Sequence, residues 1–195
     1  MNTFTRLFAV LLCASVPVMS MAQKAEMPEP KDFLVGDSWE WRQFDNRTKQ
    51  EEGKFNRSVI RVNGILRFQS ETGRSFQISN AFLGHPGQTK PWRVWPLEVG
   101  KEWVYDEDWT ESGVSGNTRQ NAKVVAYEDV TVPAGKFMAF KIEYKGWYRN
   151  SRGSSGIQFD TYWYAPEAKA DVKRLRDDGF NNWTRELVNY KRGTP

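Results

Sequence analysis

The sequence predicts an all-β protein built on a single antiparallel, strongly curved sheet, of half-barrel or barrel-like form and with little helix. Three observations predict this fold. Short runs that alternate apolar and polar residues recur along the chain, and Gly, Asn, Asp and Pro residues separate them at intervals of roughly ten residues. The 195 residues also include nine Trp, seven Tyr and twelve Phe, which are residue types that favour strands.

The N-terminus has the three parts of a secretory signal peptide. A short cationic stretch ends at Arg6, an apolar run covers residues 7–20, and Ser20-Met21-Ala22 has the small-x-small form that signal peptidase recognises. The apolar run is shorter than the roughly 20 residues that a membrane-spanning helix needs. We therefore predict that residues 1–22 are removed by cleavage near Ala22 after Sec-type export, that the protein is periplasmic or secreted, and that it has no integral membrane span.

Cleavage would also remove Cys13, the single cysteine, so the mature chain is expected to have no disulfide and no thiol chemistry. It would lower the formal net charge from +4 to +3, because Arg6 is the only charged residue lost. Basic and acidic residues are intermixed along the rest of the chain, as in a solvated mixed surface. Since no continuous basic stripe could follow a phosphate backbone, we predict no nucleic-acid partner.

One β domain is expected over residues 35–192, after a flexible lead-in at residues 23–34 that holds two prolines and shows no periodicity. A Gly- and Pro-rich loop at residues 84–96 is expected to join two parts of the sheet, because proline cannot donate to a strand ladder.

A short internal echo indicates that the domain has two similar halves, residues 35–96 and 99–192. The form V-G-x-x-W-x-aromatic opens both, and each copy places a glycine turn before a strand. If the copies are equivalent, Trp39 and Trp103 are both largely buried. The alternative is chance use of a common strand opening.

Alternation places the individual strands. We expect strands that begin near Trp39 and Trp103, and further strands at residues 54–62, 65–70, 75–81, 121–127, 137–145, 157–165 and 185–191. Met138 is expected to share one face with Phe140, two residues on.

Turn residues connect these strands. Asn63-Gly64 predicts a type I′ hairpin turn, since both residues tolerate positive φ. Residues 166–176 are either a helix or a turn followed by a strand, and the surrounding β rhythm favours the second.

Recognisable signatures of catalysis and metal binding are missing. The only histidine, His85, lies in the Gly-Pro loop and is expected to be a surface or capping residue. We find no H-x-x-x-H, no C-x-x-C and no Gly-rich phosphate loop, and therefore predict no catalytic residue, no metal site and no cofactor. A non-enzymatic role is favoured, although carboxylates such as Glu102 and Asp160 leave glycan hydrolysis open.

Three segments of the second half occur together: V-G-K-E-W from Val99, V-P-A-G-K-F from Val132, and Y-W-Y-A-P from Tyr162, which V-K-R follows at Val172. In this order and spacing they resemble a family of uncharacterised bacterial secreted or periplasmic β proteins, classed as a domain of unknown function. The resemblance covers about residues 99–190. It implies an antiparallel curved sheet and an envelope location, and it carries no catalytic residues.

Tryptophans near the expected loops and strand ends are the candidate ligand contacts, because no apolar core is required there. They are Trp92, Trp95, Trp109, Trp147 and Trp183.

A curved sheet can hold one small ligand when side chains do not fill its interior. We therefore predict a non-enzymatic periplasmic or secreted binding protein that takes an apolar or amphipathic small molecule on a concave, aromatic-lined face. One alternative is a carbohydrate-binding module or glycan-acting enzyme of the cell envelope, in which exposed Trp faces stack on sugars. Another is a structural envelope protein with a filled core. Tryptophans that line an interior favour the first function, and a flat exposed row beside two acids favours the second.

Overall fold

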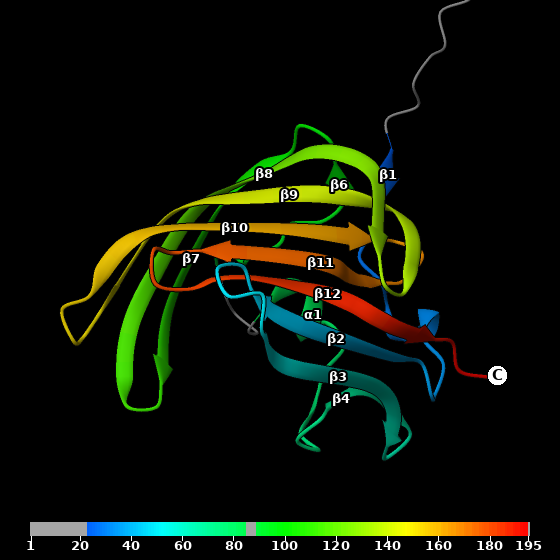
Figure 1. Cartoon of the computed structure of the whole chain (residues 1–195). Helices are drawn as coiled ribbons and strands as arrows, with labels where there is room; N and C mark the ends of the chain where they lie inside the picture. Colours follow the sequence, from blue (N-terminus) through cyan, green and yellow to red (C-terminus); the bar gives the residue numbers. More distant parts are fainter. Residues whose placement is uncertain (1–22, 85–88, 195) are drawn as a thin grey trace, which may run out of the picture.

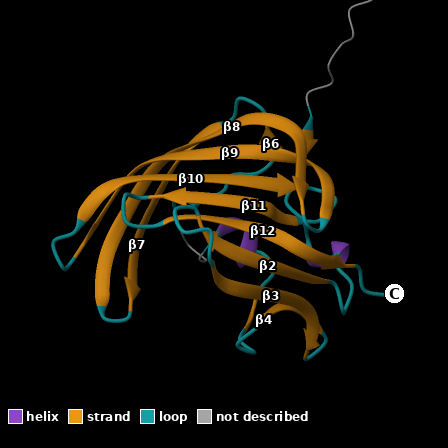
Figure 2. Cartoon of the chain, in the orientation of Figure 1, coloured by secondary structure: helices purple, strands orange, loops and turns teal. Residues whose placement is uncertain are grey.

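The structure is a computed structural model that describes residues 23–84 and 89–194. Strands make up most of it, with one short helix, α1 (Asn80–Leu83), and one 3₁₀ turn, η1 (Pro30–Asp32) (Figure 1, Figure 2). The all-β prediction is therefore confirmed. The expected signal peptide with its cleavage site and Cys13, and His85 of the Gly-Pro loop, lie outside the described residues.

Ten strands form one antiparallel sheet in the order β5-β4-β3-β2-β12-β11-β10-β9-β8-β7 (Figure 1). The sheet is open, because its edge strands β5 and β7 do not pair with each other, so the sheet does not close into a barrel. A second sheet pairs β1 (Lys24–Ala25) with β6 (Leu97–Glu98), and the prediction of a single sheet is wrong in this respect. The strands of the large sheet are β2 (Ser38–Asp45), β3 (Glu51–Val62), β4 (Ile65–Ser70), β5 (Ser75–Phe76), β7 (Glu102–Glu111), β8 (Val114–Val132), β9 (Gly135–Asn150), β10 (Ser155–Ala165), β11 (Ala170–Asp177) and β12 (Asn182–Lys191).

Local turn chemistry works as the sequence predicts. Asn63 and Gly64 have φ of 50° and 80° between β3 and β4, as a type I′ hairpin turn requires. Residues 166–169 form a turn that leads into β11, which confirms the turn-and-strand interpretation of this segment.

The strand expected at residues 75–81 is wrong beyond Phe76, because the chain turns into α1. Ile78 and Phe82 are both 2% exposed, so the buried residues here recur at i, i+4 and not at i, i+2. A run this short is compatible with both periods, and packing against the sheet selects the helical one.

The core lies on one face of the sheet, which we call the inner face; α1 lies against it. The ring of Phe82 on α1 contacts those of Phe68 on β4, Trp95 and Tyr164 on β10, with centroid distances of 6.0–6.3 Å. Phe33, which follows η1, joins the same cluster and is 2% exposed. The segment expected as a flexible lead-in thus carries β1, η1 and a core residue.

The two V-G-x-x-W segments have the same backbone geometry. Gly36 and Gly100 have φ of 89° and 92°. The Gly36 N–H donates to the carbonyl of Val59 on β3 at 3.0 Å, and the Gly100 N–H donates to the carbonyl of Val124 on β8 at 2.8 Å. Trp39 is 2% exposed, as predicted, but Trp103 is only partly buried. β2 lies inside the sheet whereas β7 is an edge strand, so fewer neighbours cover Trp103. The division into two similar halves stays a prediction.

The end of the β8–β9 hairpin buries a different face from the middle of β9. Met138, expected on the buried face of Phe140, is 40% exposed, whereas Phe137 is buried. A β-bulge in β8 shifts the register before this point, and the hairpin end reaches β12, where the N–H of Ala134 donates to the carbonyl of Leu187 at 3.0 Å. At the hairpin end Phe137 therefore lies on the covered side, and Met138 points to solvent.

Candidate functional site

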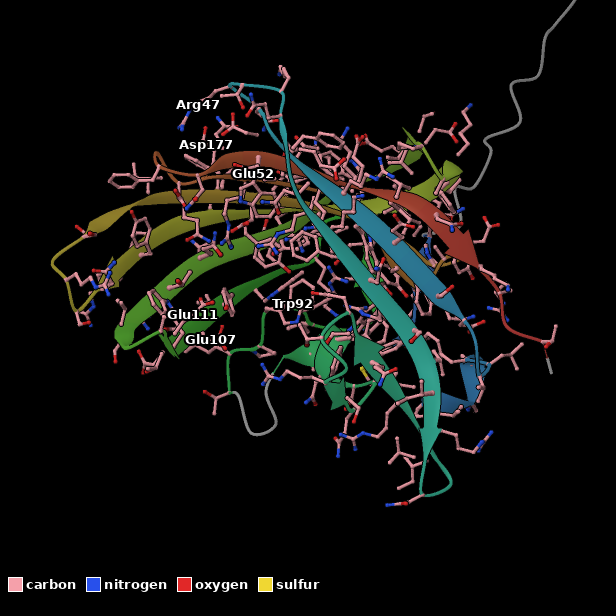
Figure 3. The ribbon with its side chains drawn as sticks, turned by 60° about the horizontal axis from the view of Figure 1, so that its bottom comes forward. Arg47, Glu52, Trp92, Glu107, Glu111 and Asp177 are labelled. Carbon is pink, nitrogen blue, oxygen red and sulfur yellow. The ribbon has the colours of Figure 1, made fainter. Side chains whose placement is uncertain are left out.

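The inner face carries a cavity of about 1330 Å³, larger than the 300–1000 Å³ or so that is typical of small-molecule pockets. Residues of both sheet edges line it, from β3 to β5 at one end and from β7 to β9 at the other. The cavity therefore extends across the sheet from one edge to the other. Figure 3 shows Trp92 next to β7, the strand that carries Glu107 and Glu111. Arg47 and Asp177 lie near each other in this view, away from Trp92.

The structure places the five predicted tryptophans in different surroundings. Trp92 and Trp109 line the cavity. Trp95 packs in the core and donates its indole N–H to a carbonyl of α1 at 3.2 Å. Trp183 is 9% exposed and lies under three guanidinium groups, 4.9, 5.2 and 5.7 Å from its ring centroid. Trp147 is 42% exposed and lies outside the cavity lining.

Trp92 is held by contacts on both its ring and its backbone. Its ring centroid is 5.2 Å from that of Tyr162 and 6.4 Å from that of Tyr144. Its carbonyl accepts hydrogen bonds from the Tyr144 hydroxyl and, at 3.2 Å, from the Trp103 indole. Trp92 is therefore a fixed aromatic wall of the cavity.

Trp109 is positioned by its cross-strand neighbours on β8. Its indole N–H donates to Thr118 Oγ1 at 3.1 Å, and its ring lies over Gly116, which is directly opposite. A Cβ at Gly116 would come within 2.3 Å of that ring. Glycine at this position therefore gives the indole the space it occupies.

Arg93 anchors the Gly-Pro loop to the inner face. Its side chain is 1% exposed, and Nη2 lies 2.8 Å from Asp171 Oδ1 on β11. The guanidinium lies 4.1 Å from the ring centroid of Trp92 and 5.2 Å from that of Tyr164. Residues 89–96 of this loop therefore do more than join two parts of the sheet, because Trp92 and Arg93 lie against the inner face and line the cavity.

Asp160 is the centre of a buried polar network behind the cavity. Its side chain is 2% exposed and lies 3.1 Å from Arg174 Nη2 and 2.8 Å from Arg176 Nε. The side-chain amides of Gln158 and Gln120 donate to it at 2.6 and 3.2 Å. Burial acts to raise the pKa of Asp160, but the two guanidinium groups outweigh burial and hold that pKa well below its usual range.

The depressed pKa of Asp160 predicts a loss of stability in acid. A carboxylate whose pKa is lower in the folded than in the unfolded state stabilises the fold above the unfolded pKa, and this contribution is lost as pH falls through the folded pKa. We expect the free energy of unfolding, measured by urea denaturation, to decrease from about pH 5 downward. The Asp160→Asn variant should show a clearly shallower decrease; an identical pH dependence would contradict the assignment.

Three further arginines line the cavity without an ion-pair partner in the described part of the chain: Arg57, Arg185 and the exposed Arg74. Among the described residues neither Arg57 nor Arg185 forms an ion pair, in contrast to Arg93, Arg174 and Arg176. Burial lowers the pKa of Arg57 and of Arg185 to about 10, so both remain charged at neutral pH.

The sequence analysis placed no arginine in a site. Its interpretation of the intermixed charges as a solvated mixed surface is wrong for Arg174 and Arg176, which both line the cavity. The available signal was period-two alternation, which puts Arg174 with Arg176 and Trp183 with Arg185 on one face of adjacent strands.

The described part of the chain has neither a candidate metal site nor a helix that could span a membrane. In residues 23–84 and 89–194, no group of three or more His, Cys, Asp and Glu side chains is placed to hold a metal ion. The same residues contain no helix with the length and apolar character needed to span a membrane.

Comparison with known proteins finds no family and two solved structures of low similarity. No family model matches the chain, and no curated protein matches it. A candidate lipoprotein of Parabacteroides distasonis is 14% identical, with a TM-score of 0.47 over 87% of this chain and 100% of the other. A candidate exported protein with a YmcC-like fold from Bacteroides fragilis is 10% identical, with the same TM-score and coverage.

Proposed function

We propose that this protein is an exported, non-enzymatic binding protein that takes an amphipathic small molecule in the cavity on the inner face of a curved, half-barrel sheet. The observation that carries the proposal is the large cavity with its mixed lining. Aromatic rings such as those of Trp92 and Trp109 offer apolar surface, and the arginines beside them offer hydrogen-bond donors. An amphipathic ligand matches both kinds of lining, whereas a purely apolar ligand would leave the arginines unsolvated.

The two alternative functions find less support in the geometry. A flat, exposed row of tryptophans beside two acids is expected of a glycan-binding surface, but Trp92 and Trp109 lie in a cavity. Two acids of that cavity already have partners, since Asp171 pairs with Arg93 and Glu107 accepts a hydrogen bond from Tyr105. A structural protein with a filled core does not need a cavity of this size.

Calorimetric titration with octyl β-glucoside, an uncharged amphiphile used below its micelle concentration, tests the proposal. We expect the mature protein to bind it and the Trp92→Ala variant to bind it about tenfold more weakly, as is typical when a buried aromatic contact is truncated. Methyl β-glucoside, which has the same headgroup without the chain, should not bind measurably.

Trp147→Ala is the matched control, because Trp147 lies outside the cavity lining; its affinity should equal that of the wild type. Since Trp92 also packs against two tyrosines, Trp109→Ala is the second variant, and the thermal midpoint of each variant is measured alongside. Binding of maltohexaose in preference to octyl β-glucoside would support the glycan alternative. Binding of neither ligand would contradict the proposal.

A further inference from the structure

We propose that the guanidinium groups of Arg57 and Arg185 form an oxyanion subsite in the cavity, which binds a phosphate, sulfate or carboxylate group of the amphipathic ligand. This inference rests on the proposed function and specifies its ligand as an amphipathic anion. Three observations support it: the contacts that hold the two side chains, the hydrogen-bond donors these contacts leave free, and the excess of positive charge around them.

Both guanidinium groups lie over the faces of aromatic rings. Arg57 on β3 lies 4.9 Å from the ring centroid of Phe68 and 5.3 Å from that of Trp41. Arg185 on β12 lies 3.5 Å from the ring centroid of Phe55. Trp41 and Phe55 are directly paired on β2 and β3, so the two guanidinium groups lie over neighbouring aromatic rings of the same sheet face. Stacking of this kind fixes the plane of a guanidinium while its N–H edge stays free.

Both side chains line the cavity, and most of their N–H donors have no partner among the described residues. The side chain of Arg185 donates to Gln43 Oε1 at 2.8 and 3.2 Å, which leaves its other donors free. Within the described part of the chain, Arg57 makes no side-chain hydrogen bond. An oxyanion is the natural partner for such donors, because planar guanidinium groups bind phosphate, sulfate and carboxylate in bidentate fashion.

Positive charge is in excess around this position. Arg185 is paired across the β11–β12 ladder with Arg174, and Arg176 lies on the same face. Asp160 is shared between Arg174 and Arg176, so one carboxylate serves two guanidinium groups. The charges of Arg174 and Arg176 lower the pKa of Arg185 further, after burial itself. A bound anion would relieve this repulsion.

Two carboxylates of the cavity lining, Asp171 and Glu71, act on Arg57 and could compete with a bound anion. Asp171 on β11 is already paired with Arg93. Glu71 forms no ion pair with Arg57 or Arg185, and its Oε2 accepts the backbone N–H of Asn56 at 3.2 Å. On the wall formed by β3, β11 and β12 the arginines therefore still outnumber the carboxylates.

The test compares octyl phosphate with octyl β-glucoside, which share the alkyl chain and differ in charge. We expect the wild-type protein to bind octyl phosphate at least about tenfold more tightly at pH 8, a difference of about 1.4 kcal/mol. Arg57→Gln and Arg185→Gln should each remove most of this preference, because they weaken the binding of octyl phosphate much more than the binding of octyl β-glucoside. Arg185→Lys, which keeps the charge, should retain part of it. Arg61→Gln, an exposed arginine at the end of β3, is the charge-matched control and should behave as the wild type.

The outcomes separate the subsite from the proposed function. Equal affinity for the two amphiphiles, unchanged in both glutamine variants, would overturn the subsite and leave the binding function standing. Failure of both amphiphiles to bind would overturn both. Inorganic phosphate is the third ligand. If it binds as tightly as octyl phosphate, and the glutamine variants no longer bind it, the subsite is supported as a site for a free ion. The proposal that the ligand is amphipathic would then be wrong. Unfolding midpoints close to wild type show that loss of binding is not loss of the fold.

Discussion

The Asp160→Asn variant is expected to lower the free energy of unfolding at pH 7 by about 3 kcal/mol, in chemical denaturation. Removing one partner of a buried ion pair typically costs about 3–5 kcal/mol, because the remaining charge stays buried without compensation. Here Arg174 and Arg176 would both lose the carboxylate with which they form an ion pair. We expect the lower end of the range, since the Arg174 and Arg176 side chains remain 22% and 29% exposed and water can partly solvate them.

Asp106→Asn is the matched control for this prediction. Asp106 on β7 also lies between two cations, 3.3 Å from Lys90 Nζ and 3.1 Å from Arg119 Nη1, and it accepts a hydrogen bond from the Asn117 amide. Its two cationic partners are about half exposed, so removing the charge should cost less than about 1 kcal/mol. Equal losses in the two variants would mean that Asp160 is not the centre of a buried network.

Trp39→Ala is expected to destabilise the protein by about 3–5 kcal/mol, a large part of the roughly 5–15 kcal/mol of a typical domain. Its ring is 2% exposed and packs against Phe33, Phe68 and Tyr190, with centroid distances of 5.7–6.1 Å. Its indole N–H also donates to the carbonyl of Ala168 at 2.8 Å, which truncation would leave without this partner. Urea denaturation monitored by circular dichroism measures the loss.

Two further tryptophans calibrate this result. Trp103→Ala should cost less than Trp39→Ala, because Trp103 lies on the edge strand β7 and is only partly buried. Trp147→Ala should cost least, since its side chain is 42% exposed. The opposite order, with Trp147→Ala the most destabilised, would show that the core does not lie on the inner face.

The sequence was sufficient where structure is decided locally. The Asn63-Gly64 turn, the turn at residues 166–169 and the buried Trp39 follow from backbone preferences and alternation over a few residues. These signals need no knowledge of which strands pair. By contrast, the same alternation at residues 75–81 was too short to distinguish a strand from the turn of helix that forms around Phe82.

The polar lining of the cavity could not be predicted in the same way, because its partners are distant in sequence. Alternation in β10 separates Ile157 and Phe159 from Gln158 and Asp160, and hydrophobicity alone would bury the first pair. The structure exposes Ile157 and Phe159 to 65% and 47% and buries Asp160. That choice depends on two arginines of β11, which enter the network only once β10 and β11 have paired.

The loop that holds Trp92 is a similar case. Nothing local indicates that a Gly- and Pro-rich connection crosses the inner face, because its position depends on the ion pair between Arg93 and Asp171 and on the tyrosines of β9 and β10. Of the five tryptophans predicted near loops and strand ends, Trp92 and Trp109 enter the proposed site. The amphipathic ligand was predicted from aromatic content, whereas its anionic group follows only from the placement of Arg57 and Arg185 in the cavity.

A crystal structure of the mature protein with octyl phosphate would show directly whether the cavity binds an amphipathic anion. We expect the alkyl chain in the cavity, against the rings of Trp92 and Trp109, and the phosphate oxygens about 2.7–2.9 Å from the guanidinium nitrogens of Arg57 and Arg185. An octyl phosphate molecule bound instead on the outer face, next to Trp147, would contradict it, as would an empty cavity at saturating ligand.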